Sequence, residues 1–209
     1  MFIELVDALR CPVPHEEGWL VAAAVRMEAR HIVEGTLGCP ICAAEYPIAL
    51  GVADFRRAGG HLESRPRRED HELAMRLAAQ LDLSDARGFA VLLGEWGAYA
   101  ADLLGVSDCP LLLIDPSVEI VGAPGISVIR CDGDLPLAAG AARAMALDVG
   151  TAARVTSAVR ATRPMGRVVA PVSVAVPADV RELARDTAVW VGERTALASP
   201  LVALHVRRA

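Results

Sequence analysis

Four side chains near the start of the chain have the types and spacing of a metal site. Cys39 and Cys42 form a Cys-x-x-Cys pair, and Cys11 and His15 precede it at a spacing of four. A pair of this kind in a chain without an export signal indicates half of a metal site or a redox pair. Zinc prefers four thiolate and imidazole ligands, supplied here as two local pairs. The sequence therefore predicts a zinc site made by Cys11, His15, Cys39 and Cys42.

Two other interpretations of the cysteine pair stay open. A redox pair is expected at the start of a helix that follows a strand. Pro40 and Ile41, with no helix-forming run behind them, argue against that. A metal-free fold that buries three thiols is the other alternative, because free cysteine is often found in protein cores.

The residues around the cysteine pair resemble a known family. Residues 30–42, followed by Tyr-Pro-Ile at 46–48 and Gly-Val at 51–52, are similar to the small zinc-ribbon subunit that activates RNA and protein methyltransferases. Cys11, within Leu-Arg-Cys-Pro, matches the first knuckle of that family, whereas His15 stands where the family has a second cysteine or no ligand. The resemblance covers about the first quarter of the chain. It implies a protein partner, a methyltransferase or a translation-related protein, contacted through the ribbon.

The pattern of the first 55 residues predicts an antiparallel ribbon around one metal. A short helix or turn is expected at 2–9, and strands are expected at 18–27, 30–37 and 46–52. Such a unit is too small to fold on core burial alone, so a structural zinc would supply much of its stability. Residues 56–70 are charged, contain Gly59, Gly60 and Pro66, and are predicted to be a linker.

The rest of the chain alternates helical and buried-strand patterns. Leu73, Leu77 and Leu81 recur every four residues and predict a helix at 69–81. Buried strands are expected at 89–94, 111–114, 126–130, 144–147 and 168–176, and helices at 98–104, 151–161 and 179–185. Segments 187–191 and 201–206 are expected to form a closing antiparallel hairpin. Strands that alternate with helices predict a mostly parallel sheet covered on both faces.

Acidic residues follow four of the predicted strands: Glu95, Asp115, Asp132 and Asp148. In a doubly wound sheet these strand ends form the ligand crevice. A carboxylate after the second strand suits a ribose, because it can accept hydrogen bonds from both hydroxyls. Each acid can instead cap a turn or helix, and that interpretation is favoured for Asp148, just before Thr151.

From about residue 69 to the end, the chain resembles the class I S-adenosylmethionine-dependent methyltransferases. The matching features are Glu-Trp-Gly at 95–97, Asp115, Cys-Asp at 131–132, the segment 163–167 and the terminal hairpin. The resemblance implies a cofactor site at Glu95, Gly97, Asp115 and Asp132, in which Gly97 allows close approach of the methionine part, Asp115 binds ribose and Asp132 binds the adenine amino group. The expected fold is α/β: a zinc ribbon (1–55), a linker (56–70) and a Rossmann-like methyltransferase domain (71–209).

Departures from that family bear on activity. Tyr99 stands where a glycine would let the backbone approach the cofactor. No base-directed motif follows the fourth strand, and no catalytic residue is identified. These departures favour a zinc-binding, methyltransferase-like protein that is a non-catalytic binding or regulatory module with a degenerate cofactor pocket. The alternative is an active methyltransferase that carries its own ribbon, because methyl transfer needs little acid–base chemistry when positioning supplies much of the rate.

Charge and hydropathy bear on nucleic-acid binding, membrane insertion and cellular location. The formal net charge of -5 argues against bulk electrostatic capture of nucleic acid, although Arg65, Arg67 and Arg68 form a local basic group. The sequence has no uninterrupted apolar run long enough for a membrane span. The first ten residues lack a basic leader, so a cytoplasmic location is expected.

Overall fold

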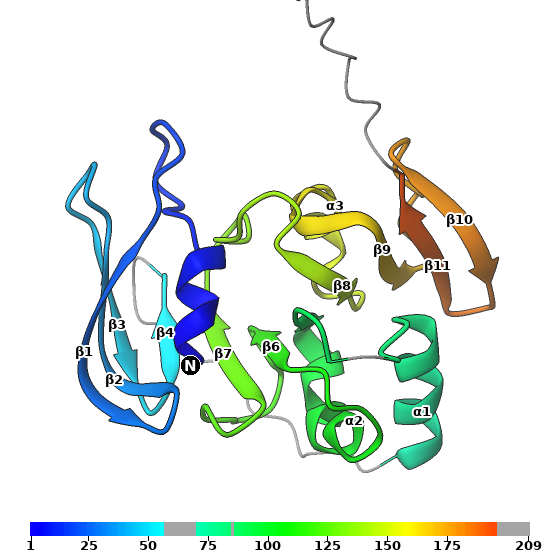
Figure 1. Cartoon of the computed structure of the whole chain (residues 1–209). Coiled ribbons are helices and arrows are strands. Elements are labelled where there is room, and N and C mark those ends of the chain that lie inside the picture. The colour runs from blue at the N-terminus through cyan, green and yellow to red at the C-terminus, as the bar shows by residue number, and fades with distance from the viewer. Residues whose placement is uncertain (57–69, 85, 196–209) are drawn as a thin grey trace, which may run out of the picture.

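The computed structural model describes residues 1–56, 70–84 and 86–195. Eleven strands in this part of the chain form one sheet, in the order β1-β2-β3-β4-β7-β6-β5-β8-β9-β11-β10 (Figure 1). The strands are β1 (Val21–Glu28), β2 (His31–Gly38), β3 (Glu45–Ala49), β4 (Val52–Asp54), β5 (Ala90–Leu93), β6 (Leu111–Ile114), β7 (Ile126–Arg130), β8 (Ala142–Ala146), β9 (Thr162–Pro171), β10 (Val180–Arg185) and β11 (Val189–Arg194).

The helices are short. The α-helices are α1 (His71–Gln80), α2 (Ala100–Val106) and α3 (Val155–Ala161), and the 3-10 helices are η1 (Ile3–Ala8), η2 (Gly94–Tyr99) and η3 (Ala152–Arg154). Asp70 caps α1 by accepting a 2.9 Å hydrogen bond from the Leu73 backbone N–H. None of the helices in the described ranges is long and apolar enough to cross a membrane.

Strands β1 to β4 form the antiparallel ribbon that the sequence predicts. The single third strand expected at 46–52 is wrong, because this stretch makes two strands, β3 and β4. Leu50 and Gly51 join them with positive φ angles of 51° and 73°. Two successive residues with positive φ form the tight turn that suits a two-residue hairpin, and Ala49 pairs with Val52 across it.

The parallel strands reverse their order at β5. β6 and then β7 lie on one side of β5, and β8 and then β9 lie on the other. This is the strand order of a doubly wound, Rossmann-like sheet. Together with the antiparallel hairpin at the C-terminal side, it gives the methyltransferase-type α/β fold that the sequence predicts. β6 and β7 have the predicted bounds.

The C-terminal hairpin differs from the prediction in its members. It consists of β10 and β11, and β11 also pairs with β9. The helix predicted at 179–185 is therefore wrong: residues 180–185 are an edge strand, because pairing with β11 overrides the local helical pattern. The hairpin partner predicted at 201–206 lies outside the described residues.

Two strands begin earlier than expected. β8 begins at Ala142 instead of 144, and β9 begins at Thr162 instead of 168. Residues 164–167, which precede the strand expected at 168–176, are part of β9. Met165 has a φ of 64° there, and the register shifts between Ala142 and Ala144 of β8. The chain therefore bulges here.

Alternate residues of the parallel strands face two different cores. On one face Leu92 and Leu113 pack with Leu77 of α1 and Leu103 of α2. On the other face the strands pack both with α3 and with the ribbon, through a group that includes Leu93, Ile114, Val159, Leu37 and Ile48. The ribbon thus covers part of the second face of the Rossmann-like sheet.

Two backbone connections join the ribbon to that sheet. β4 pairs in parallel with β7, with Ala53 opposite Ile129. Residues 8–10 run beside 136–138: the Arg10 N–H donates to the Pro136 carbonyl at 3.0 Å, and the Ala138 N–H donates to the Ala8 carbonyl at 2.8 Å. The division at 1–55, 56–70 and 71–209 stays a prediction, and the expected linker falls almost wholly outside the described residues.

We expect the substitution Ala53→Asp to destabilise both parts of the molecule together. Ala53 is fully buried in β4, opposite Ile48 of β3 and Ile129 of β7. An unpaired carboxylate there should lower the free energy of unfolding by about 3 kcal/mol or more. Urea unfolding followed by circular dichroism and by tryptophan fluorescence should shift to a lower midpoint, with the two signals coincident.

The matched control is Ala49→Asp, at an exposed position of the neighbouring strand β3. It should leave the midpoint nearly unchanged. Two separate transitions in the wild type would contradict the shared core.

Candidate metal centre and the carboxyl ends of the parallel strands

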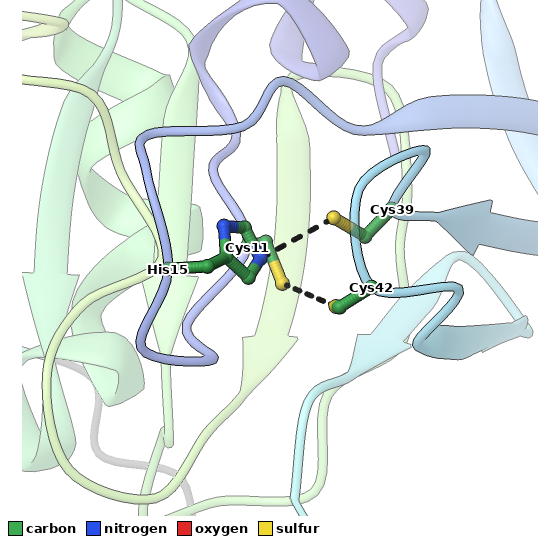
Figure 2. Close-up of side chains that lie close together, drawn as sticks. All are labelled: Cys11, His15, Cys39 and Cys42. Atoms are coloured by element: carbon green, nitrogen blue, oxygen red, sulfur yellow. Dashed lines mark hydrogen bonds between the residues drawn. The ribbon is translucent and has the colours of Figure 1, made fainter.

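The four predicted metal ligands come from two loops at one end of the ribbon. Cys11 and His15 lie in the loop between η1 and β1, and Cys39 and Cys42 lie in the turn between β2 and β3 (Figure 2). That turn is closed by Ala43, whose φ is 56° and whose N–H donates to the Cys39 carbonyl at 2.9 Å. No helix follows the cysteine pair, so the geometry favours a knuckle over a redox motif.

The donor atoms have the spacing of a tetrahedral site. All four lie within 4.8 Å of one another. The Cys11 and Cys42 sulfurs are 3.7 Å apart, and the Cys39 sulfur is 3.5 Å from Nε2 of His15 (Figure 2). Zinc bond lengths with tetrahedral angles would put two sulfurs about 3.8 Å apart, and a sulfur and a nitrogen about 3.6 Å apart. The three cysteines of the cluster form no disulfide, which would need an S–S distance of about 2.05 Å.

Groups around the cluster orient the ligands. His15 Nδ1 contacts the Glu16 carbonyl, which leaves Nε2 facing the sulfurs, as in many metal-bound histidines. The Tyr46 hydroxyl lies 3.2 Å from the Cys11 sulfur, and its ring stacks on Phe55 at 4.5 Å. Gly18 lies beside this cluster, where a Cβ would lie 2.8 Å from the end of the exposed Ile41 side chain.

The knuckle also favours a thiolate at Cys39. Burial raises the pKa of this thiol, but backbone N–H groups of Cys42 and Ile41 donate to its sulfur and outweigh burial, so the pKa falls to about 7. The thiolate is the form that binds metal. The Cys/His cluster can therefore hold a zinc ion.

The four predicted cofactor residues all lie at the end of the sheet where the parallel strands finish, here called the carboxyl edge. Glu95 and Gly97 lie in η2, which follows β5, while Asp115 follows β6 and Asp132 follows β7. Glu95 and Asp132 are exposed, whereas Gly97 is buried. The structure thus brings them to one edge, but the loops there contact one another closely.

The loop after β5 contacts the loop after β6 directly. The Ser117 N–H donates to the Gly94 carbonyl at 3.2 Å. A Cβ at Gly97 would lie 2.7 Å from the Pro116 Cβ, so the missing side chain of Gly97 admits Pro116. Tyr99 is buried and packs with Val118 in the same pair of loops. Pro116 therefore occupies the space beside Gly97 that the expected cofactor would approach.

Asp115 is already bound on both of its carboxylate oxygens. Arg154 Nη1 lies 2.6 Å from Oδ2, and the Cys131 backbone N–H donates to Oδ1 at 3.1 Å. Arg154 Nη2 also donates to the Cys131 carbonyl at 2.9 Å. The Cys131 thiol beside them is buried, and burial followed by the Asp115 charge raises its pKa to about 12.

The loop after β8 binds the loop after β5. Asp148 Oδ2 accepts from the Glu95 backbone N–H at 2.6 Å, and the Trp96 indole N–H donates to the Leu147 carbonyl at 2.9 Å. A Cβ at Gly94, whose φ is 60°, would collide with the Asp148 carboxylate. Sequence reasoning missed Arg154 and the second role of Asp148, because their contacts join residues 39 and 53 positions apart.

These contacts test whether the carboxyl edge fits S-adenosylmethionine. The carboxylate expected to bind ribose is paired with Arg154, and the loop expected to receive the methionine part is filled by Pro116 and Asp148. The residues in this arrangement do not fit the cofactor.

Comparisons with known proteins find similarity in structure alone. No protein-family model matches the chain, and no curated protein matches it. The tRNA methyltransferase TrmI from Aquifex aeolicus is 13% identical with a TM-score of 0.42, over 65% of this chain and 73% of that chain. The antibiotic-resistance methyltransferase Kmr is 13% identical with a TM-score of 0.39, over 58% and 93%.

A third solved structure is the 16S rRNA methyltransferase RsmC of T. thermophilus, in complex with AdoMet and guanosine. It is 17% identical with a TM-score of 0.34, over 82% of this chain and 47% of that chain. At such scores the fold assignment depends on the strand order described above, not on these neighbours.

We expect the isolated protein to hold about one zinc ion per chain, because four donor atoms of the types that zinc prefers lie within 4.8 Å of one another. Cys39→Ser should lose the metal and lower the midpoint of thermal unfolding, since metal binding contributes directly to folding. Elemental analysis and circular dichroism measure the two effects.

Cys109→Ser is the control. Cys109 is also buried but lies in the Rossmann-like part, before β6, and this variant should keep its zinc. Reduced wild-type protein without zinc would contradict the assignment.

Proposed function

We propose that this chain is a zinc-binding protein whose methyltransferase-like fold serves as a non-catalytic binding or regulatory module. The observation that carries the proposal is the closure of the carboxyl edge. Asp115 is paired with Arg154 at 2.6 Å, and the loops after β5 and β6 are joined by the hydrogen bond from Ser117 to Gly94. The resemblance implies that, in an active methyltransferase, Asp115 and the loop after β5 would face the cofactor.

The donor set supports a structural role for the metal. Structural zinc sites are closed by four protein ligands, whereas catalytic sites keep one position open for water or substrate. Cys11, His15, Cys39 and Cys42 supply all four. In this proposal the ion fixes the loop that precedes β1 against the turn between β2 and β3.

The outer side of the ribbon supports a protein partner. In β1 and just before it, Trp19, Val21 and Val25 are 59%, 61% and 77% exposed. An antiparallel sheet with one face in solvent normally carries polar residues there, and grouped exposed apolar side chains often mark interaction sites. We propose that this ribbon face binds another protein, either a methyltransferase or a translation-related protein.

Titration of the zinc-loaded protein with S-adenosylmethionine tests the non-catalytic role. We expect no saturable heat up to about 1 mM ligand, which corresponds to binding weaker than about 4 kcal/mol. Binding at micromolar concentration, with methyl transfer to an acceptor, would establish the alternative of an active methyltransferase.

A pair of substitutions on the ribbon face tests the partner. Val21→Glu with Val25→Glu should abolish recovery of a protein that copurifies with the tagged wild type, because charge would enter an apolar contact. Met75→Glu on α1 is the control, since Met75 is 55% exposed and lies in the Rossmann-like part. Equal recovery with both variants would place the contact elsewhere.

A further inference from the structure

One short segment makes two of the contacts that occupy the predicted cofactor groups. Residues 148–154, here called the plug segment, connect β8 to α3 and include η3. At its start, the Asp148 carboxylate reaches the loop after β5. At its end, the Arg154 guanidinium reaches Asp115 after β6.

The first contact places the Asp148 carboxylate at the loop that follows β5. Asp148 Oδ2 accepts from the Glu95 N–H at 2.6 Å. Its Oδ1 accepts from the Thr151 N–H and from the Thr151 hydroxyl, both at 2.7 Å. Gly94 has no side chain, and only this lets the carboxylate approach so closely.

The second contact places hydrogen-bond donors at the ribose-type carboxylate. Arg154 Nη1 lies 2.6 Å from Asp115 Oδ2, and the two side chains are only 20% and 14% exposed. Arg154 Nη2 is held by the Cys131 carbonyl at 2.9 Å. The guanidinium is therefore held by two partners, Asp115 and the Cys131 carbonyl.

The groups that make these two contacts are of the same chemical kinds as two groups of S-adenosylmethionine. S-adenosylmethionine carries a carboxylate at its methionine end and a hydroxyl pair on its ribose. Asp148 offers a carboxylate to a backbone N–H, and Arg154 offers donors to an acidic side chain. By the resemblance, the loop after β5 would receive the methionine part and Asp115 the ribose. The plug segment presents an anion at the first and a donor group at the second.

We propose that the plug segment is an internal ligand that takes the place of the cofactor. This inference rests on the proposed function and specifies what closes the carboxyl edge. Trp96 reinforces the arrangement, because its indole N–H holds the Leu147 carbonyl immediately before the segment. Removing the two charged side chains should expose the backbone N–H of Glu95 and the carboxylate of Asp115.

The experiment titrates S-adenosylmethionine, adenosine and methionine separately into zinc-loaded protein. The variants are Asp148→Ala, Arg154→Ala and the double variant, and circular dichroism checks that each is folded. Arg160→Ala and Asp108→Ala are matched controls at exposed positions. Wild type and controls should show no saturable binding up to about 1 mM.

The double variant should bind S-adenosylmethionine at least about tenfold more tightly than that limit. Arg154→Ala alone should gain adenosine binding, because adenosine needs only the Asp115 half of the site. Asp148→Ala alone should gain methionine binding. These single variants keep the test decisive where the double variant does not fold.

The outcomes separate the two proposals. Folded variants that bind none of the three ligands would overturn the plug segment as an internal ligand, while the non-catalytic role would stand. Wild-type binding at micromolar concentration would overturn both. If the control variants gain binding as well, the gain does not come from removing Asp148 and Arg154. That result would also overturn the plug segment as an internal ligand.

Discussion

Burial of the parallel sheet on both faces is the constraint on which the rest of this structure depends. β5 and β6 are apolar along their whole length, so each face needs a cover. α1 and α2 cover one face, but on the other face α3 shares the task with the ribbon. The ribbon therefore shares one core with α3 and the parallel strands. Its apolar inner side and the pairing of β4 with β7 both follow from that role.

The candidate metal centre is tied into the same core. Cys11 comes directly after residues 8–10, which pair with 136–138 of the Rossmann-like part. Tyr46 touches the Cys11 sulfur, and its ring stacks on Phe55, which follows β4. Free energy gained by metal binding is free energy of folding where the site does not exist in the unfolded chain. A bound ion would thus stabilise the sheet beyond the ribbon, through the segments that carry its ligands.

The sequence predicts best what depends on local spacing. Strands such as β6 and β7 appear as short apolar runs with clear ends, and the Cys/His cluster appears because each ligand pair is close in sequence. The capping role of Asp148 is also local, since the Thr151 N–H donates to it. These signals need no knowledge of the tertiary fold.

The failures have physical reasons as well. The helix predicted at 179–185 is replaced by the edge strand β10, because pairing with β11 decides the conformation of this segment. The break between β3 and β4 depends on two positive φ angles, of which only Gly51 gives a hint. The pairing of Asp115 with Arg154 joins residues 39 positions apart, and nothing in the local sequence of either residue announces it.

Several polar groups of the carboxyl edge have their hydrogen-bond partners within the chain. A catalytic site keeps preorganised donors and acceptors directed at the place where substrate charge will develop, so part of their hydrogen bonding is left to the ligand. At this edge, hydrogen bonds within the chain occupy both Asp115 oxygens and the Gly94 carbonyl. The Glu95 N–H donates to Asp148. Polar groups that are paired within the chain contribute to stability, and their hydrogen bonds are not available to a ligand. The contacts that occupy the carboxyl edge therefore also hold the loops after β5, β6 and β8 together.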